Sequence, residues 1–517
     1  MSAFYITTAI EYANGEPHLG HAFEKIGADA IARYRRLRGD TVHLLVGSDD
    51  HGLKVARAAQ AAGRTPGEQA NQISAAFRRA WDALGIGYDR FVRTSTAEHA
   101  AGVRAIIGRI LARHPDAFYE KAYEGWYCVG CESFRTPREL DNGRCAVHPS
   151  LDIERVAESN WFFRLSAFRE QLATFLSATP EFVQPVARYN EVLSLVERGL
   201  EDVSITRASL DWGIPFPIAD ARGRHQTIYV WFDALPSYLT ATGFPEAHDG
   251  AEWPAQVHVV GKDITRFHCV LWPAVLIAAG LPLPERVWAH GFVTANGVRL
   301  SKSAGAWIDL DEAIARYGVD ALRYFLLREI PFDDDGDFTW QRFDSRYTAD
   351  LANTLGNLTS RVAALVARHA PDGCVPQVQS DRGGAVADAI HATEARIALA
   401  LERYVTAFDA FLPHEALAAV FDALAAGNEL ISRTAPWALA TDPARRDDFD
   451  RTIRTSVTLL AQAAVLLWPV IPATAERLWR SLGGPACVEA QRLADVGRLD
   501  PTGWRVTRIP PVFPRAR

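Results

Sequence analysis

The segment Phe4-Tyr5-Ile6-Thr7-Thr8-Ala9-Ile10 predicts a buried strand, and Pro17-His18-Leu19-Gly20-His21 follows it at the start of a predicted helix over residues 18–38. The imidazoles of His18 and His21 therefore lie on the first turn of that helix. Backbone N–H groups at a helix N-terminus attract anions, and imidazoles can donate further hydrogen bonds. We expect phosphate to bind at this turn, although two histidines at such a place can also serve only as helix caps.

Strand and helix signals alternate around this unit. A second strand is expected over residues 41–47 and helices over 54–62 and 66–84, which is the βαβ pattern of a parallel sheet. Residues 116–227 interrupt the pattern with Cys, Gly and aromatic clusters. The alternation resumes with strands expected over 227–232 and 257–260 and a helix near 267–279. A parallel-sheet nucleotide-binding domain with an inserted module explains this order.

The composition is that of a folded, water-soluble protein with two to four domains. The 517 residues are 48% hydrophobic and 23% charged, and the formal net charge is −7. A negative net charge argues against indiscriminate nucleic-acid binding but allows a local basic groove. The chain has no apolar run long enough for a transmembrane helix, and strand-like sequence at its start leaves no room for a signal peptide. We therefore expect a cytoplasmic protein without membrane partners.

Four residues in the inserted module have the spacing of two metal-binding knuckles. Cys128 and Cys131 form one C-x-x-C pair, and Cys145 and His148 follow thirteen residues later as C-x-x-H. Three thiolates and one imidazole suit one tetrahedral Zn²⁺ ion, and four protein ligands leave no open position for chemistry. We expect a structural zinc site, with an empty knuckle as the alternative. A disulfide is a poor interpretation in a chain without a secretory signal.

A second short segment, Arg299-Leu300-Ser301-Lys302-Ser303, places one lysine between two serines. A lysine in a small loop is a simple way to set a cation against a polyphosphate. The chain has only five lysines, so an ammonium retained here is notable. Residues 17–21 resemble the HIGH signature of class I aminoacyl-tRNA synthetases, and residues 299–303 resemble their KMSKS signature. The two segments also occur in the order that is typical of this class.

Acidic and aromatic residues follow the predicted strands. Asp49 and Asp50 lie just beyond the strand over 41–47, at the edge where parallel sheets bind ligands, and an anion there can pair with a substrate ammonium group. A solvated turn is the alternative. The segments 229–238 and 261–268 supply aromatic, aliphatic and histidine side chains that suit an apolar pocket with a few polar groups. By composition alone such aromatics are more often core residues.

With these segments combined, the whole chain resembles the methionyl-tRNA synthetase family. The resemblance implies a methionine site formed by Ile10, Tyr12, Asp49, Trp231, Tyr238, Ile264 and His268. It implies catalysis by His18, His21 and Lys302, and an ATP site formed by Pro17, Gly20, Glu24, Gly261, Asp263, Arg299, Ser301, Lys302 and Ser303. Asn357, Arg361 and Trp437 match the anticodon-reading residues, although composition alone would place Trp437 in the core.

The resemblance also implies the domain order. We expect a Rossmann-type catalytic domain split by a zinc-binding connective-peptide insertion and followed by an α-helical anticodon-binding bundle. The expected boundaries are 1–115 and 228–292 for the catalytic halves, 116–227 for the insertion, 293–348 for the region containing the KMSKS-like segment and contacting the tRNA stem, and 349–517 for the bundle. The chain ends where longer relatives add a dimerisation domain, so we expect a monomer.

The expected reaction has two steps. Methionine and ATP form methionyl-adenylate and pyrophosphate, with Mg²⁺ held largely by phosphate oxygens and water, and the adenylate then acylates initiator and elongator tRNA(Met). Two departures from the family pattern are Glu11, which stands beside the methionine site, and the Arg299-Leu300 pair in place of Lys-Met. Three alternatives stay open: a class I synthetase for leucine, isoleucine, valine or cysteine, an adenylating enzyme without tRNA, and a non-catalytic RNA-binding paralogue.

Overall fold

The computed structural model describes residues 3–130, 132–135, 140–146, 151–246, 252–300, 308–378 and 383–514. The chain forms two compact units, and each is built from separate stretches of sequence. The sheet unit comprises Ala3–Pro17 and His43–His290. The helical unit comprises His18–Val42 and Gly291–Arg517, together with the first two residues. No helix within the described ranges is both long enough and apolar enough to cross a bilayer.

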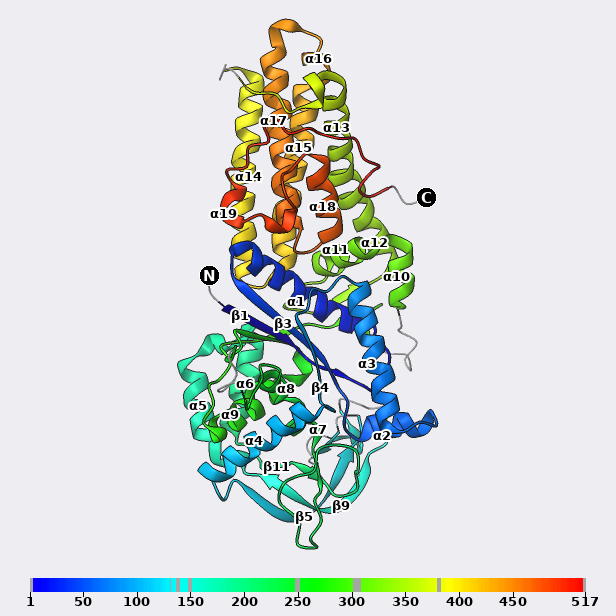
Figure 1. The fold of residues 1–517 in the computed structure, drawn as a ribbon, viewed down its shortest axis with the longest axis vertical. Helices are drawn as coiled ribbons and strands as arrows, with labels where there is room; N and C mark the ends of the chain where they lie inside the picture. The colour runs from blue at the N-terminus through cyan, green and yellow to red at the C-terminus, as the bar shows by residue number, and fades with distance from the viewer. Residues whose placement is uncertain are drawn as a thin grey trace. The chain divides into compact units, whose positions relative to one another are not determined.

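The sheet unit is organised around a seven-stranded sheet in which every pairing with a recorded register is parallel. Its spatial order is β10 (Val183–Gln184), β15 (Val287–His290), β14 (Val257–Gly261), β1 (Ala3–Thr8), β3 (Thr41–Asp49) and β2 (Glu11–Tyr12), with β4 (Arg90–Arg93) also paired to β3. Figure 1 shows β1 and β3 side by side. The chain adds β3 on one side of β1 and β14 on the other. The β1/β14 boundary is therefore the switch point, where such sheets bind ligands beyond the carboxyl ends of their strands.

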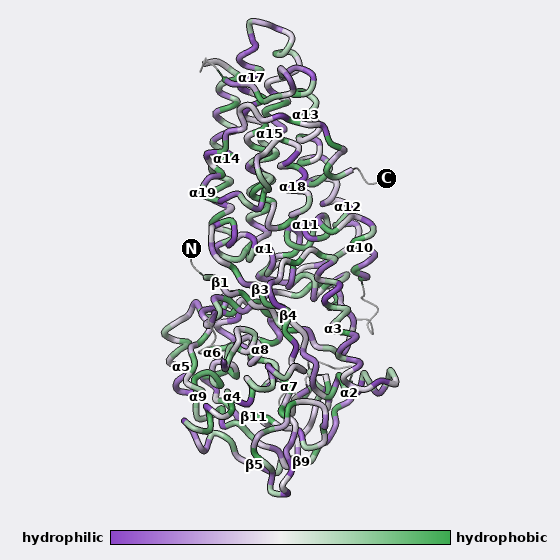
Figure 2. Tube along the Cα trace, viewed as in Figure 1, coloured by the Kyte–Doolittle hydropathy of each residue, from purple (hydrophilic) through white to green (hydrophobic). Residues whose placement is uncertain are grey.

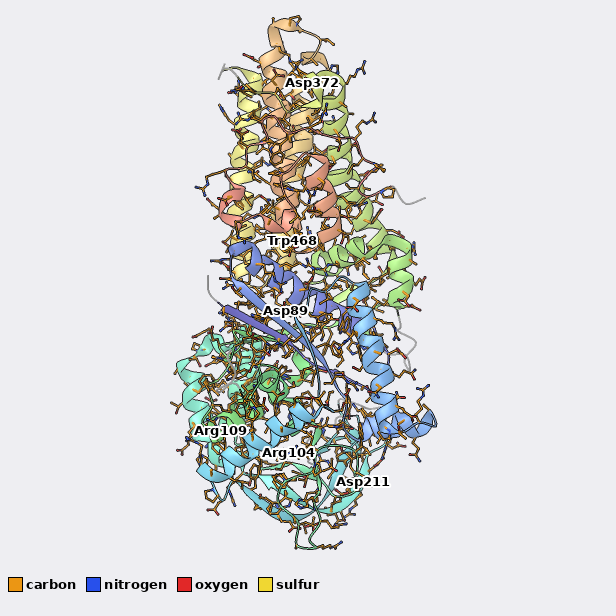
Figure 3. All side chains as sticks on the ribbon, in the orientation of Figure 1. Asp89, Arg104, Arg109, Asp211, Asp372 and Trp468 are labelled. Carbon is orange, nitrogen blue, oxygen red and sulfur yellow. The ribbon has the colours of Figure 1, made fainter. Side chains whose placement is uncertain are left out.

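The central strands are buried because helices and loops cover both faces, as continuous apolar runs in parallel strands require. Residues 4–8 of β1 and 44–49 of β3 are all buried. The chain enters β4 at Asp89, labelled in Figure 3, whose carboxylate accepts the Leu44 backbone N–H at 2.7 Å. The predicted strands over 4–10, 41–47 and 257–260 are confirmed within two residues at each end.

A second, antiparallel sheet occupies the inserted region. Its order is β11 (Val203–Ser204), β9 (Glu154–Phe163), β5 (Phe118–Cys128) and β6 (Ser133–Arg135). Two short pairs stand beside it, β7 (Leu140–Asp141) with β8 (Arg144–Cys145) and β12 (Thr206–Arg207) with β13 (Thr227–Ile228). The predicted strand over 227–232 is wrong beyond Ile228, because residues 230–234 form a short helix, α7.

Within the described residues, eight α-helices belong to the sheet unit, and α4 to α9 share one apolar core with its strands. They are α2 (Leu53–Ala61), α3 (Pro66–Ala83), α4 (Ala97–Arg113), α5 (Arg169–Ala178), α6 (Val186–Arg198), α7 (Val230–Ala234), α8 (Ser237–Thr240) and α9 (Trp272–Ala279). A π-helical turn over Phe267–Leu271 precedes α9, which confirms the helix expected near 267–279. Helices expected over 54–62 and 66–84 are confirmed as α2 and α3.

The helical unit combines α1 (Leu19–Arg38) with the C-terminal part of the chain. A small sheet, in the order β17 (Val298–Arg299), β16 (Val293–Ala295) and β18 (Gly336–Phe338), precedes the bundle. The later helices are α10 (Leu310–Tyr317), α11 (Val319–Glu329), α12 (Trp340–Arg346), α13 (Asn357–His369), α14 (Ala385–Asp409), α15 (Pro413–Thr434), α16 (Pro436–Leu439), α17 (Arg446–Leu467), α18 (Pro472–Ser481) and α19 (Leu493–Val496). The expected helical C-terminal region is confirmed.

Buried contacts join α1 to its neighbours in this unit, among them an ion pair and several aromatic contacts. The Arg323 guanidinium of α11 binds the Asp29 carboxylate of α1 at 2.5 Å and also donates to the Val470 and Pro469 carbonyls, so this buried charge is paired and hydrogen-bonded. Phe23 packs edge-to-face on Phe332. Figure 2 shows apolar and polar residues alternating along α13, α14, α15 and α17, as expected for helices with one buried face.

Candidate active site

Predicted methionine-site residues follow the strands on both sides of the switch point. Ile10 and Tyr12 come after β1, and Gly261 ends β14. Tyr12 is paired in register with Asp49 at the end of β3. A Cβ atom on Gly47 would lie 2.9 Å from Ile10 Cγ2 and 2.5 Å from Val92, so glycine is needed for this close packing. The topology thus brings Ile10, Tyr12 and Asp49 to one edge of the sheet.

Aromatic residues of the predicted pocket contact one another beside β14. The Tyr238 hydroxyl lies 2.7 Å from His268 Nε2, and His268 Nδ1 lies 3.1 Å from the Ile264 carbonyl. A carbonyl only accepts, so Nδ1 carries the proton and Nε2 accepts from Tyr238. The Trp231 ring stands edge-on to His268 and stacks on Phe267 at 4.0 Å. Four predicted residues, Trp231, Tyr238, Ile264 and His268, therefore form one connected group.

Asp49 and Asp50 are both buried but differ in their partners. Asp50 binds the Arg93 guanidinium at 2.8 Å and accepts from the Ser48 and Ser95 hydroxyls. Asp49 has a hydrogen bond of 3.4 Å from Thr94 and one from the His51 backbone. Burial, with the nearby Asp233, Glu132 and Asp50 carboxylates, raises the pKa of Asp49 well above its usual range. Asp50 is already paired with an arginine, so Asp49 is the carboxylate of the two that could bind a cationic group of a substrate.

Sequence reasoning missed a buried group behind Asp49. The Asp233 carboxylate lies 2.6 Å from His51 Nδ1 and 2.8 Å from His99 Nε2, and His99 Nδ1 lies 2.8 Å from the Thr240 hydroxyl. Burial opposes the ionisation of Asp233, but the two imidazoles outweigh it and lower the pKa of Asp233. The four residues come from four separate segments, so no local pattern marks them as a group.

His18 and His21 cap α1 through each other. His18 Nδ1 accepts the backbone N–H groups of Gly20 and His21, and His21 Nδ1 accepts the N–H of His18. Each Nδ1 atom is therefore unprotonated, which leaves an Nε2–H donor on each ring. Burial and the Lys25 charge lower the pKa of His21 to about 3. Capping and phosphate binding are thus compatible, because one ring nitrogen serves each role.

Glu24, predicted near the adenosine, is tied to a lysine that the predicted site did not include. Lys25 is fully buried and its Nζ atom lies 2.7 Å from Glu24 Oε1. A buried ammonium is stable only beside such a carboxylate. One oxygen of Glu24 is therefore occupied within α1.

The KMSKS-like segment is described only at its start. Arg299 ends β17 and is paired in register with Thr294 of β16. Ser301, Lys302 and Ser303 lie outside the described residues, as do Cys131 and His148 of the predicted zinc site. Pro17 and Asp263 are described and lie in the loop before α1 and in a short 3-10 turn after β14, respectively.

The two described knuckle cysteines are compatible with a metal site. Cys128 ends β5 and Cys145 ends β8, and both thiols are about 1% exposed. Within the described residues neither forms a disulfide, and no group of three or more metal-binding side chains is complete. Two buried thiols at the ends of short hairpins fit the chemistry of a thiolate–imidazole zinc site.

The predicted anticodon residues are brought together in part. Asn357 and Arg361 are four residues apart on α13, and the Arg361 guanidinium lies 5.9 Å from the centroid of the Trp437 ring. Trp437 is 50% exposed at α16, so the alternative of a core residue is wrong. An exposed indole beside an arginine offers a stacking surface for an unpaired base.

Comparisons with known proteins agree with this arrangement. A family model described as "tRNA synthetases class I (M)" matches residues 4–148 and 135–363, and one described as "Anticodon binding domain of methionyl tRNA ligase" matches residues 381–502. The chain belongs to the methionyl-tRNA synthetase family. Methionine–tRNA ligases from Brucella suis and Mycobacterium bovis are each 41% identical, over 99% and 100% of this chain and 98% of each relative.

Solved structures of the family show the same fold. The Mycobacterium tuberculosis methionyl-tRNA synthetase in complex with methionyl-adenylate matches with a TM-score of 0.93 and 40% identity over the full length of both chains. The free form of that enzyme matches with a TM-score of 0.86 and 37% identity. The parallel-sheet region is therefore the Rossmann-type catalytic domain of the family, and the C-terminal helices are its anticodon-binding domain.

Proposed function

We propose how this chain carries out the reaction of its family, the ATP-dependent ligation of methionine to tRNA(Met) through methionyl-adenylate. The observation that carries the proposal is the meeting of Ile10, Tyr12 and Asp49 at the carboxyl edge of one parallel sheet, next to the Trp231–His268 group. The aromatic group suits an uncharged thioether side chain, since sulfur packs favourably at ring edges. The ionised Asp49 carboxylate would hold the α-ammonium group.

In the first step, a carboxylate oxygen of methionine attacks the α-phosphorus of ATP and pyrophosphate leaves. The Nε2–H donors of His18 and His21 would stabilise the negative charge that develops on the phosphate oxygens, as neutral donors rather than as cations. Lys302 would add a full positive charge. Pro17, Gly20, Glu24, Gly261, Asp263, Arg299, Ser301 and Ser303 would complete the nucleotide site. Mg²⁺ would be held mainly by phosphate oxygens and water.

In the second step, a ribose hydroxyl of the terminal adenosine of tRNA attacks the carbonyl carbon of the adenylate and AMP leaves. The side chains of Asn357, Arg361 and Trp437 would read the anticodon of initiator and elongator tRNA(Met). The exposed Trp437 ring under Arg361 supports this assignment. We propose the same domain boundaries as expected from the sequence. The catalytic halves are 1–115 and 228–292, the insertion is 116–227, the region with the KMSKS-like segment is 293–348, and the anticodon-binding bundle is 349–517.

Cys128, Cys131, Cys145 and His148 would hold one structural Zn²⁺ ion in the inserted module. Bound zinc would fold the two hairpins around it and take no part in the reaction. The burial of Cys128 and Cys145 supports this. Metal analysis of the purified protein and of a Cys128→Ser variant tests it: the wild type should hold one zinc per chain and the variant should hold less.

A cytoplasmic monomer completes the proposal. The five described cysteines form no disulfide with one another, which fits a reducing compartment. Among the described residues, the large exposed apolar side chains lie on separate elements, which supports a monomer: Trp126, Leu151, Val186, Val298, Leu399 and Trp437. Light scattering at micromolar concentration should give the mass of one chain.

The decisive experiment is ATP–pyrophosphate exchange with each of the twenty amino acids, followed by charging of tRNA(Met). Exchange should depend on methionine alone, and charging should follow. A Lys302→Ala variant should lose exchange while still binding methionine. Exchange driven by leucine, isoleucine, valine or cysteine instead, or normal exchange by the Lys302 variant, would contradict the assignment.

A further inference from the structure

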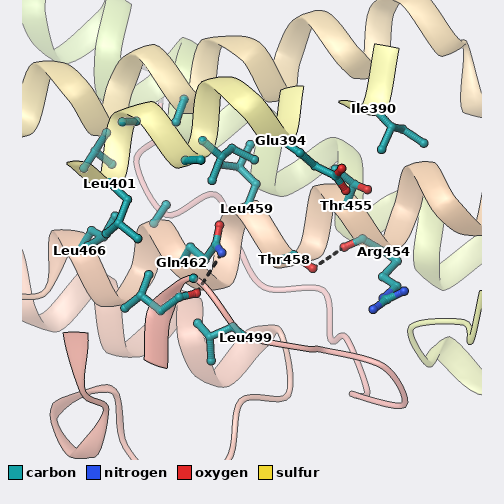
Figure 4. Close-up of a pocket in the computed structure, with 18 of the residues that line it drawn as sticks. Ile390, Glu394, Leu401, Arg454, Thr455, Thr458, Leu459, Gln462, Leu466 and Leu499 are labelled. Atoms are coloured by element: carbon teal, nitrogen blue, oxygen red, sulfur yellow. Dashed lines mark hydrogen bonds between the residues drawn. The ribbon is translucent and has the colours of Figure 1, made fainter. Parts of the chain in front are cut away.

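The helical unit contains a cavity of about 840 Å³ between α14 and α17 (Figure 4). Val420 and Ala423 of α15 line it from a third helix, and Val496 and Leu499 line it from α19 and the loop that follows. None of the described residues assigned to methionine, ATP, zinc or anticodon binding lines this cavity. A volume of this size is typical of sites that hold a small organic molecule.

Gln462 of α17 presents an unsatisfied acceptor to the cavity. Its side chain is 7% exposed, and its Nε2 atom donates to the Val496 carbonyl at 2.9 Å. Its Oε1 atom has no hydrogen-bond partner within the described residues. In Figure 4 this oxygen points away from the dashed bond, toward α14. A buried acceptor without a donor destabilises the protein, so a ligand that donates an N–H or O–H group is favoured here.

Two carboxylates of α14 line the same cavity. Glu394 and Glu402 are eight residues apart, which is about 12 Å along a helix. In the part of the chain that the structure describes, neither side chain has a hydrogen bond or an ion pair. Figure 4 shows the Glu394 carboxylate beside Thr455 of α17. Glu394 and Glu402 are exposed, so their charges meet solvent at the rim of the hollow, whereas Gln462 Oε1 is buried and has no donor within the described residues.

The positive groups around the cavity have partners, and the walls are aliphatic. Arg454 is paired with Asp500 at 3.4 Å, and Arg451 is also engaged by a neighbouring group. The walls carry Leu401, Leu459 and Leu466. Leu459 and Leu466 are buried and Leu401 is half-buried, so a ligand with methylene segments would lie against apolar surface, whereas an anion would face two carboxylates. The charges therefore favour a cationic ligand with an aliphatic body.

We propose that this cavity binds a linear aliphatic polyamine. Its terminal ammonium groups would reach Glu394 and Glu402, its methylene segments would lie against the leucines, and an inner N–H group would donate to Gln462 Oε1. Each of the three acceptors then gains a donor. The proposal does not depend on the ligase activity, because the cavity lies entirely within the anticodon-binding bundle.

Titration calorimetry of the full chain with spermidine, at near-physiological salt and without tRNA, tests the proposal. Wild type should bind one equivalent. Glu394→Gln, Glu402→Gln and Gln462→Met should each weaken binding about tenfold. Glu415→Gln makes the same charge change on α15 away from the cavity and should bind as wild type does. Circular dichroism and melting of each variant establish that it is folded.

A second probe separates a polyamine site from a merely apolar hollow. Octane-1,8-diol has a comparable chain without ammonium groups and should bind far more weakly than spermidine. Equal binding of the diol, or no saturable binding of spermidine, would overturn the proposal. Equal weakening by Glu415→Gln would show general attraction to an acidic protein and would overturn it as well. Unchanged binding by Gln462→Met would place the amine outside the cavity, with the same consequence.

Discussion

The Nδ1 atom of His51 lies 2.6 Å from the Oδ2 atom of Asp233, and both side chains are buried. The other oxygen of Asp233 faces His99 Nε2 at 2.8 Å. Burial would lower the pKa of His51, but the Asp233 carboxylate outweighs it and raises that pKa. The negative charge of Asp233 opposes the ionisation of the nearby Asp49. The protonated His51 imidazole offsets part of that charge. This pair makes the buried carboxylates behind the methionine site compatible with one another.

Asp233→Asn keeps the size of the side chain and removes its charge. It should lower the free energy of unfolding by about 3 kcal/mol where the pair is charged. The lowered pKa of Asp233 means that its contribution is lost as pH falls through that pKa, and the raised pKa of His51 means that its contribution is lost as pH rises through that pKa. The difference from wild type, measured by urea unfolding, should therefore be largest between about pH 4 and 6.5.

Thr240→Val is the matched control for this variant, because it removes the hydroxyl beside His99 Nδ1 but no charge. Its effect on stability should vary little over the same pH range. A loss in Asp233→Asn that stays constant from pH 4 to 9 would show that only packing is affected.

The group around Asp233 also shows which parts of the site sequence reasoning can reach. Asp49 follows a strand with a clear apolar pattern, so its place at the sheet edge can be predicted from topology, whereas Tyr12 is expected there only from the family resemblance. His99 and Asp233 are 134 residues apart in sequence and are brought together only by tertiary packing. The local sequence pattern around neither residue predicts this contact. The strand expected over 227–232 failed for a similar reason. β-branched and aromatic residues there favour a strand, but burial against the core lets residues 230–234 form α7.

Methionine binding should release a proton from Asp49. The pKa of Asp49 is raised well above its usual range by burial and by neighbouring carboxylates, whereas a bound ammonium group favours the ionised form. With this raised pKa, the free protein loses stability as pH rises through the pKa of Asp49. Methionine binds the ionised carboxylate, so the stabilisation of the protein by methionine should increase over the same pH range. Calorimetry in two buffers of different ionisation enthalpy measures the proton. Asp49→Asn should release none and should bind methionine about 100-fold more weakly. A heat independent of buffer in the wild type would contradict the role of Asp49.

His18→Asn separates helix capping from phosphate binding. Asparagine caps helices well, so α1 should keep its stability, but the Nε2–H donor of His18 is lost. Pyrophosphate exchange should fall about 100- to 1000-fold. His18→Ala should lose the same activity and also about 1 kcal/mol of stability. Normal exchange by His18→Asn would show that His18 only caps the helix.

Trp437→Ala should affect tRNA but not adenylate formation. The ring is half exposed, so its removal should change stability little. If it stacks on an anticodon base, kcat/KM for charging should fall about 10- to 100-fold while pyrophosphate exchange stays normal. Leu399→Ala removes another exposed apolar side chain of the bundle and should leave both steps unchanged. An equal loss of exchange and charging in Trp437→Ala would point to a structural role instead.

Gly27→Ala tests how tightly α1 is packed, and Gly108→Ala in α4 is its matched control at an open helix position. A Cβ atom on Gly27 would come within 2.2 Å of the Phe332 ring, so Gly27→Ala should force that ring to shift and should cost about 1–3 kcal/mol of unfolding free energy. Gly108 lies within α4, and a Cβ atom there meets nothing within 4 Å. Gly108→Ala should therefore stabilise the protein by about 1 kcal/mol, since alanine favours helix over glycine. Urea unfolding followed by circular dichroism measures both changes, and stabilisation by Gly27→Ala would contradict the close packing of α1 on Phe332.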